Sequence, residues 1–309
     1  MERRLRLRMA WAFIISLSLL LCATGAMAGV VVTISGNQAL ANISLTNGSG
    51  TFTADVTITF DSPSNLTAEE LNLTAVLVDP NDPTLLTRLP ACTPSCVSVD
   101  PAFPMLITVE PVSYPWMFRS GFETADTEPE NLNFLNTYEF EVHTSNLDCS
   151  APAAGVSCPI TAYRLFKAPI GGNFDDITDD VLKGSVRARG RGGAFSQFLV
   201  VQDTRDSLSV EQGKSFNLEA RIRSASLSNT LRSDLLGQLA QVQVAVLLDQ
   251  NYAQAISYLD QLIFEIQAHA GIDVFNRWSS DHNLVNDAGE MLSLAQTLRY
   301  TLVRLQNGH

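Results

Sequence analysis

The stretch TFTADVTITF, residues 51–60, decides the fold of the longer part of the chain. Its apolar residues Phe52, Ala54, Val56, Ile58 and Phe60 alternate with threonine and aspartate. A period of two places the apolar side chains on one face of a β-strand. The stretch therefore predicts a strand that turns one face toward a core and the other toward polar surroundings.

Segments of similar composition lie on both sides of 51–60 and are separated by turn-forming runs such as TNGSG, DSPSN and DPNDP. We expect further strands over 29–34, 71–78, 105–110, 137–143, 160–166, 184–190, 194–201 and 215–222. Strands joined by such turns predict an antiparallel β-sandwich over residues 29–225. The length leaves one sandwich or two smaller ones as alternatives.

From about Leu227 the apolar residues recur at helical spacing. We expect a helix over 231–248, a second that Asn251 caps and that ends before Gly271, and a third over 283–305 with Asp281 as its cap. The expected buried stripes are Leu231, Leu235, Leu239 and Val242, then Ile256, Leu259, Ile263 and Ile266, then Met291, Ala295, Leu298, Leu302 and Leu305. Short connections between three amphipathic helices predict an antiparallel three-helix bundle over 226–309.

The stretch LLDQNYAQAISYLDQLIFEIQAHAG, followed by MLSLAQTL, resembles the FIMAH-type helical domain of bacterial exported proteins. The resemblance covers about residues 231–305 and rests on Tyr252, Ala255, Ile256, Leu259, Ile263, Ile266, Ala268, Gly271, Leu292 and Ala295. It implies an accessory module on an exported protein and brings no catalytic residue with it. No family is identified for the part before it.

The chain opens with the pattern of a secretory signal peptide. Four arginines precede an apolar run from about Trp11 to Ala23, and Ala26 and Ala28 supply the small residues that cleavage requires. The run is shorter than the roughly 20 apolar residues that span a bilayer. We therefore expect residues 1–28 to be removed, so that the mature chain begins at Gly29 in the periplasm or outside the cell and keeps no transmembrane span.

Four cysteines remain after the leader, Cys92, Cys96, Cys149 and Cys158. An even number in an exported chain indicates disulfides. The neighbours in sequence are the favoured partners, Cys92 with Cys96 and Cys149 with Cys158, because short loops cost the least entropy to close. Neither the paired spacing of a zinc site nor a redox C-x-x-C motif is present.

The net charge excludes two classes of partner. The 309-residue chain carries −12, and removal of the leader, with its four arginines and one glutamate, lowers this to −15. Nucleic acid and anionic membrane surfaces both require a basic partner. Neither is therefore expected to bind this protein.

One acidic stretch, NFDDITDD, is a candidate calcium site through Asp175, Asp176, Asp179 and Asp180. Hard cations such as Ca²⁺ prefer clustered carboxylate oxygens. The spacing lacks the glycine and the final glutamate of an EF-hand loop. A solvated turn, or the acidic first turn of a helix, explains the stretch without a metal and is the favoured interpretation. No other cofactor is indicated.

Two further stretches each have two interpretations. The aromatic residues of SYPWMFRSGF, 113–122, suit either stacking on a sugar or partner, or a place in the core. The basic run RARGRGG, 187–193, suits either the docking of an acidic partner or the end of a strand with its turn.

The sequence contains no recognisable catalytic motif. Neither H-E-x-x-H nor G-x-S-x-G occurs, and His143, His269, His282 and His309 are widely spaced. A triad assembled from distant residues stays open. We therefore expect a non-catalytic binding or structural module with a protein or glycan partner. The alternative is a secreted hydrolase whose active site the sequence does not reveal.

Overall fold

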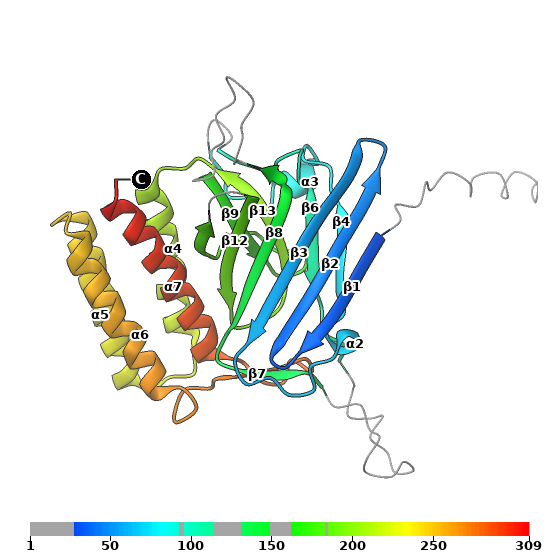
Figure 1. Ribbon diagram of the computed structural model, residues 1–309. Helices are drawn as coiled ribbons and strands as arrows, with labels where there is room; N and C mark the ends of the chain where they lie inside the picture. The colour runs from blue at the N-terminus through cyan, green and yellow to red at the C-terminus, as the bar shows by residue number, and fades with distance from the viewer. Residues whose placement is uncertain (1–27, 93–95, 114–130, 149–161, 183–184, 309) are drawn as a thin grey trace, which may run out of the picture.

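The computed structural model describes residues 28–92, 96–113, 131–148, 162–182 and 185–308 (Figure 1). The stretch 51–60 lies in β3 (Gly50–Phe60), and its five alternating apolar side chains are all buried. β3 is central in a sheet with the order β1 (Ala28–Ser35), β2 (Gln38–Asn47), β3, β8 (Tyr138–Asp148), β12 (Ser185–Gly192) and β11 (Thr178–Leu182). We call it the first sheet.

A second sheet faces the first and makes the fold a sandwich. Its order is β10 (Asp175–Asp176), β9 (Tyr163–Ala168), β13 (Gln197–Asp203), β6 (Met105–Val109) and β4 (Leu73–Leu77), and β5 (Val97–Ser98) also pairs with β13. Every strand pair in both sheets is antiparallel within the described residues. Phe140 of the first sheet stacks on Phe198 of the second, with ring centroids 3.8 Å apart, within one shared core. The predicted antiparallel sandwich is therefore confirmed, as one sandwich and not two.

The outer face of the second sheet has a small core of its own. The segment that contains α3 (Pro83–Leu86) lies over it, and Leu85, Leu89 and Val99 pack with Phe166 and Val201. The disulfide Cys92–Cys96 belongs to this segment, as predicted. The expected bridge Cys149–Cys158 lies outside the described residues. The bridge Cys92–Cys96 therefore closes a short turn within the covering segment, directly before β5.

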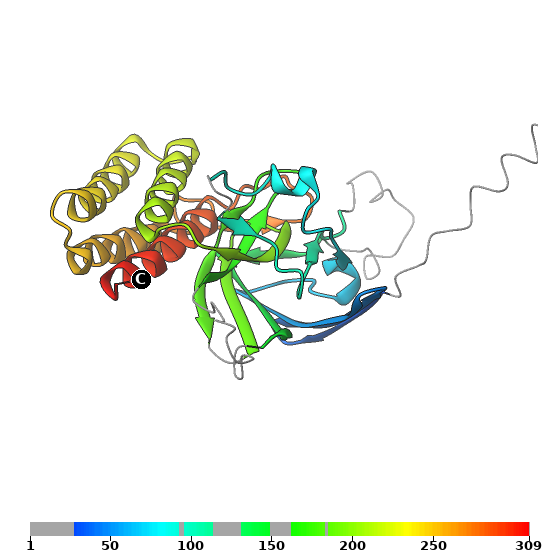
Figure 2. The same ribbon diagram turned by 90° about the horizontal axis from the view of Figure 1, so that it is seen from above.

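The described residues form four long helices, which gather at one side of the sandwich (Figure 2). They are α4 (Ser207–Ser224), α5 (Asn229–Leu247), α6 (Tyr252–His269) and α7 (Asp287–Gln306), and they share one core. The three expected helices at the C-terminus are confirmed as α5, α6 and α7. Asn251 caps α6 as predicted, because its side chain accepts a hydrogen bond from the Gln254 backbone N–H at 3.1 Å. The cap of α7 is Asn286 and not Asp281.

The fourth helix, α4, corrects the prediction of a strand over 215–222. The face that α4 turns toward the protein contains Val210, Lys214, Leu218 and Ile222, all of them buried. The lysine interrupts the apolar stripe, and Gly213 beside it is typical of a turn. The helical part of the chain therefore begins at Ser207, well before the expected boundary at 225/226.

Three smaller elements complete the fold. α2 (Ala68–Leu71) lies between β3 and β4, and β7 (Asn133–Leu135) pairs with β14 (Arg277–Ser279). β14 corrects the expectation of an all-helical C-terminal part. It ties the α6–α7 connection to the sandwich, where the rings of Trp278 and Phe134 stack with their centroids 5.3 Å apart. No helix in the described ranges is long and apolar enough to cross a membrane.

Gly213 gives a test of α4. The position is exposed, and a Cβ there would meet no atom within 4 Å. We expect Gly213→Ala to raise the free energy of unfolding by about 0.5–1 kcal/mol, because alanine loses less backbone entropy in a helix. Chemical denaturation of the full chain measures this. Gly271→Ala is the matched control and should destabilise, because Gly271 has a φ of +75°. A loss of stability in Gly213→Ala would contradict the assignment of a helix there.

Candidate functional site

The acidic stretch 173–180 folds into β10 and β11, and its carboxylates separate. Side chains of successive strand residues point to opposite faces. Asp176 pairs with Lys214 of α4, and Asp175 accepts a hydrogen bond from a different residue of that helix, the Asn217 side chain, at 3.1 Å. Asp179 and Asp180 belong to β11, where they meet arginines of β12. The four predicted calcium ligands therefore do not converge.

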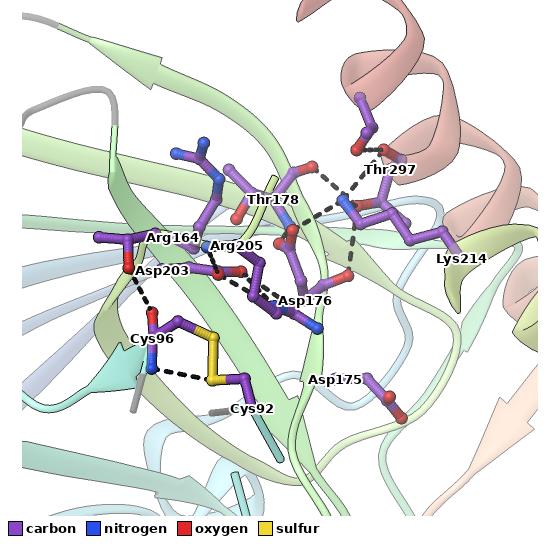
Figure 3. A network of polar contacts seen from close by, with 12 residues as sticks. Cys92, Cys96, Arg164, Asp175, Asp176, Thr178, Asp203, Arg205, Lys214 and Thr297 are labelled. Carbon is purple, nitrogen blue, oxygen red and sulfur yellow. Dashed lines mark hydrogen bonds and ion pairs between the residues drawn. A yellow bond between two sulfur atoms is a disulfide. The ribbon is translucent and has the colours of Figure 1, made fainter. Parts of the chain in front are cut away.

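Asp176 forms a buried ion pair with Lys214 of α4 (Figure 3). The Lys214 Nζ lies 2.8 Å from the Asp176 Oδ2 and donates to the Thr297 hydroxyl of α7 at 2.6 Å. The Thr297 hydroxyl donates in turn to the Thr178 carbonyl at 2.8 Å, and the Thr178 N–H donates to the Asp176 Oδ1 at 2.8 Å. These four residues are between 0 and 7 % exposed. Two strands and two helices therefore meet in one closed polar network.

Burial and neighbouring charges shift the pKa values of Asp176 and Lys214. Burial by itself would raise the pKa of Asp176, but the nearby Lys214 and Arg164 outweigh it and hold that pKa below its ordinary value. Burial also lowers the pKa of Lys214. A carboxyl with a lowered folded pKa stabilises the fold above the ordinary aspartate pKa, near 4. This contribution is lost as the pH falls through the folded value.

A second ion pair, Arg205 with Asp203, lies at the end of β13 beside the disulfide loop. The Arg205 guanidinium donates to both carboxylate oxygens of Asp203, with Nε to Oδ1 at 3.0 Å and Nη2 to Oδ2 at 2.7 Å among its hydrogen bonds. The Thr204 backbone N–H and hydroxyl both donate to the Cys96 carbonyl, at 2.7 and 3.1 Å. Figure 3 shows the disulfide beside these residues. The stapled loop is therefore anchored at the end of β13, directly before α4.

The basic run 187–193 lies in β12 and its turn, in agreement with the interpretation as a strand end. Its arginines form a ladder of ion pairs across the outer face of the first sheet. Arg189 pairs with Glu141 of β8 at 2.7 Å, and Arg191 pairs with Asp179 of β11 at 2.9 Å. Burial raises the pKa of Asp179 despite the arginine. The ladder satisfies these charges within the sheet.

No metal site is evident in the part of the chain that the structure describes. No group of three or more histidine, cysteine, aspartate or glutamate side chains there is arranged to hold an ion. His269 instead pairs with Asp273 at 2.7 Å, which raises the pKa of His269. The ring of His282 meets Trp278 edge-on. The aromatic stretch 113–122 lies outside the described residues from position 114 on, as does His309.

A row of polar residues that sequence reasoning missed crosses the first sheet on its outer face. Asp55 of β3 lies directly opposite His143 of β8, and their Oδ2 and Nδ1 atoms are 3.5 Å apart. The His143 Nε2 lies 2.7 Å from the Ser185 hydroxyl of β12. A shallow hollow of about 410 Å³ borders the row and is lined by Asn42, Ser44, Thr53, Asp55, His143 and Ser145 among others. Only the pairing of the strands brings these residues together, so their spacing in the sequence carried no signal.

An exposed apolar cluster lies in the α6–α7 connection. Ile272, Phe275, Leu284 and Val285 are 82, 63, 40 and 57 % exposed, and we call these four the loop patch. The first three line a hollow of about 220 Å³ together with Asp273 and Arg277. Single exposed apolar residues are normal on a protein surface, but a cluster of large ones marks an interaction site.

The fold and these sites define a β-sandwich to which a helical bundle is fixed by a buried ion pair. Residues 16–306 match the family of unknown function DUF6689, so the chain belongs to that family. No curated protein and no solved structure matches the chain. The resemblance of residues 231–305 to a FIMAH-type domain is not addressed by these comparisons and stays a prediction.

The ion pair makes a prediction about stability. We expect Lys214→Met and Asp176→Leu to cost about 3–5 kcal/mol each, because either change leaves an uncompensated buried charge. The double variant should cost clearly less than the sum, since it removes both charges. Denaturant titration of the full chain measures all three.

The control for this prediction is the exposed pair Arg299–Asp260, whose N···O distance of 2.7 Å is as short. Arg299→Ala should cost no more than about 1 kcal/mol, because water screens exposed pairs. Additive losses in the double variant would show that Lys214 and Asp176 act independently, which would contradict the role we assign to the pair.

Proposed function

We propose that this protein is an exported binding module of the periplasm or extracellular space, and that it docks a partner protein through the loop patch. The exposure of the four loop-patch side chains, three of which line one hollow, is the observation that carries this proposal. The leader pattern of residues 1–28 supports export.

The backbone beneath the loop patch is fixed by hydrogen bonds. The Gly271 N–H donates to the Val274 carbonyl at 2.9 Å, and Val274 itself is buried. The Ala288 N–H donates to the Phe275 carbonyl at 2.8 Å. On the sandwich side, the Asn136 N–H donates to the Asn276 carbonyl at 2.7 Å. A surface held in this way loses little conformational entropy when a partner binds, so its apolar area contributes more to affinity.

The chemistry of the loop patch favours a protein over a glycan. Three of its four side chains are aliphatic, whereas a sugar ring is recognised by flat aromatic faces with polar groups beside them. An apolar side chain of another protein fits the hollow between Ile272, Phe275 and Leu284. The net charge of −15 that remains after removal of the leader favours a partner with a basic rim around that side chain.

Variants of the loop patch test the proposal. The mature protein is used to capture partners from the envelope fraction of its host, and binding of the captured partner is then titrated. Truncation of a central hot-spot residue costs 2 kcal/mol or more, so Phe275→Ser should weaken binding about 30-fold or more. The matched control is Phe216→Ser, because Phe216 of α4 is 68 % exposed but lies outside the loop patch.

Two outcomes would overturn this function. Equal losses of binding in Phe275→Ser and Phe216→Ser would show that the loop patch is not the docking surface. A dimer in sedimentation velocity that Phe275→Ser converts to a monomer would show that a second copy of the chain occupies the loop patch in place of a different partner.

A further inference from the structure

Asp55, His143 and Ser185 have the mutual arrangement of an acid, a base and a nucleophile. The Ser185 Oγ lies 2.7 Å from the His143 Nε2, which is hydrogen-bonding distance. The other ring nitrogen, Nδ1, faces the Asp55 Oδ2 at 3.5 Å. Such a triad is recognised by the roles and geometry of its members, not by their order in the chain. The proposed docking function makes no use of these residues.

A hydrogen bond to Asp55 and the strand pairing at Ser185 fix the positions of these side chains. The Asn42 Nδ2 of β2 donates to the Asp55 Oδ1 at 2.7 Å, which leaves the Oδ2 directed at His143. The pairing of β12 with β8 shifts register between Ser185 and Val186, so that Ser185 lies opposite Asp148. Register shifts of this kind re-aim a side chain and are frequent next to active sites. The hydrogen bond between the Ser185 hydroxyl and the His143 ring lies beside this irregularity.

The residues around Ser185 include a hollow for a substrate and an arginine that can stabilise negative charge in the transition state. His143 and Asp55 line the hollow of about 410 Å³, which is large enough for a small organic group. Arg187 follows Ser185 by two residues, on the same face of β12, and lies opposite His143 in register. Its side chain is 47 % exposed, with Glu141 at 3.7 Å, so the guanidinium can turn toward an oxyanion beside Ser185.

We propose that Ser185 is the nucleophile of an acyl-transfer site that hydrolyses small, activated carboxylic esters. With the ring proton on Nδ1, the His143 Nε2 accepts the Ser185 proton while the Oγ bonds to the ester carbonyl carbon. The bond to the leaving oxygen then breaks, and His143 returns the proton to that alcohol. Water attacks the acyl-serine with the same assistance, which releases the acid and restores Ser185. The openness of the site limits it to esters with good leaving groups, because water screens Asp55, whose side chain is 63 % exposed.

Covalent labelling tests the site without any knowledge of the natural ester. The full mature chain is treated with a fluorophosphonate, and the modified residue is identified by intact mass and peptide mapping. Hydrolysis of p-nitrophenyl acetate is followed in parallel. We expect one label on Ser185, and no label on the exposed Ser49, which serves as the internal reference.

Variants separate the roles of the three residues. Ser185→Ala should abolish labelling, and His143→Gln should slow both reactions about 100-fold or more, which is the usual contribution of a general base. Asp55 is a positioning residue, so Asp55→Ala should slow both reactions and Asp55→Glu should restore part of the rate. Ser49→Ala is the matched control and should react as the unaltered chain does.

Unchanged thermal midpoints in these variants establish that the rates report the site and not unfolding. Equal labelling of Ser185 and Ser49 would overturn the proposal. A rate of ester hydrolysis that is the same in Ser185→Ala and the unaltered chain would overturn it as well, as would full reactivity in His143→Gln.

Discussion

The ion pair between Lys214 and Asp176 is the constraint on which the arrangement of this protein depends. Lys214 comes from the first helix of the bundle and Asp176 from the edge of the second sheet, and Thr297 of α7 completes the contact. Two buried charges would each destabilise the fold if left alone. The sandwich and the bundle therefore satisfy one another's charges, which fixes their relative orientation more strictly than apolar packing would.

A second contact between the sandwich and the bundle involves no charge and lies at the N-terminal end of α7. A Cβ at Gly289 would lie 1.8 Å from the Asn136 carbonyl oxygen, so only glycine permits the helix to approach the sandwich this closely. The Asn286 side chain, which caps α7, also donates to the carbonyls of Asn136 and Gly193 at 2.6 and 3.0 Å. The α6–α7 connection, which bears the loop patch, ends at these contacts. They fix the C-terminal end of the surface that we propose for docking.

Periodicity predicted the elements whose buried faces contain a regular apolar stripe. The stretch 51–60 and the stripes of α5 and α7 belong to this class, and their apolar residues are buried except for the partly buried Leu305 at the end of α7. Helix α4 was missed because its buried face contains Lys214, which forms the ion pair between the bundle and the sandwich. β2 was missed because Ala39 and Ala41 supply much of its buried face, and small side chains give a weak strand pattern. The row Asp55–His143–Ser185 could not be predicted, because strand pairing and a register shift assemble it from three distant segments.

The central claim is that the buried ion pair makes the sandwich and the bundle one cooperative unit. Equilibrium unfolding of the mature chain in urea, followed by two signals at once, tests this most directly. The far-UV ellipticity at a helical wavelength reports α4 to α7. In a Trp116→Phe variant, in which Trp278 is the one tryptophan of the mature chain, fluorescence reports the core of the sandwich. We expect coincident transitions with one midpoint. A helical transition that is complete before the fluorescence changes would show that the bundle unfolds independently, which would contradict this claim.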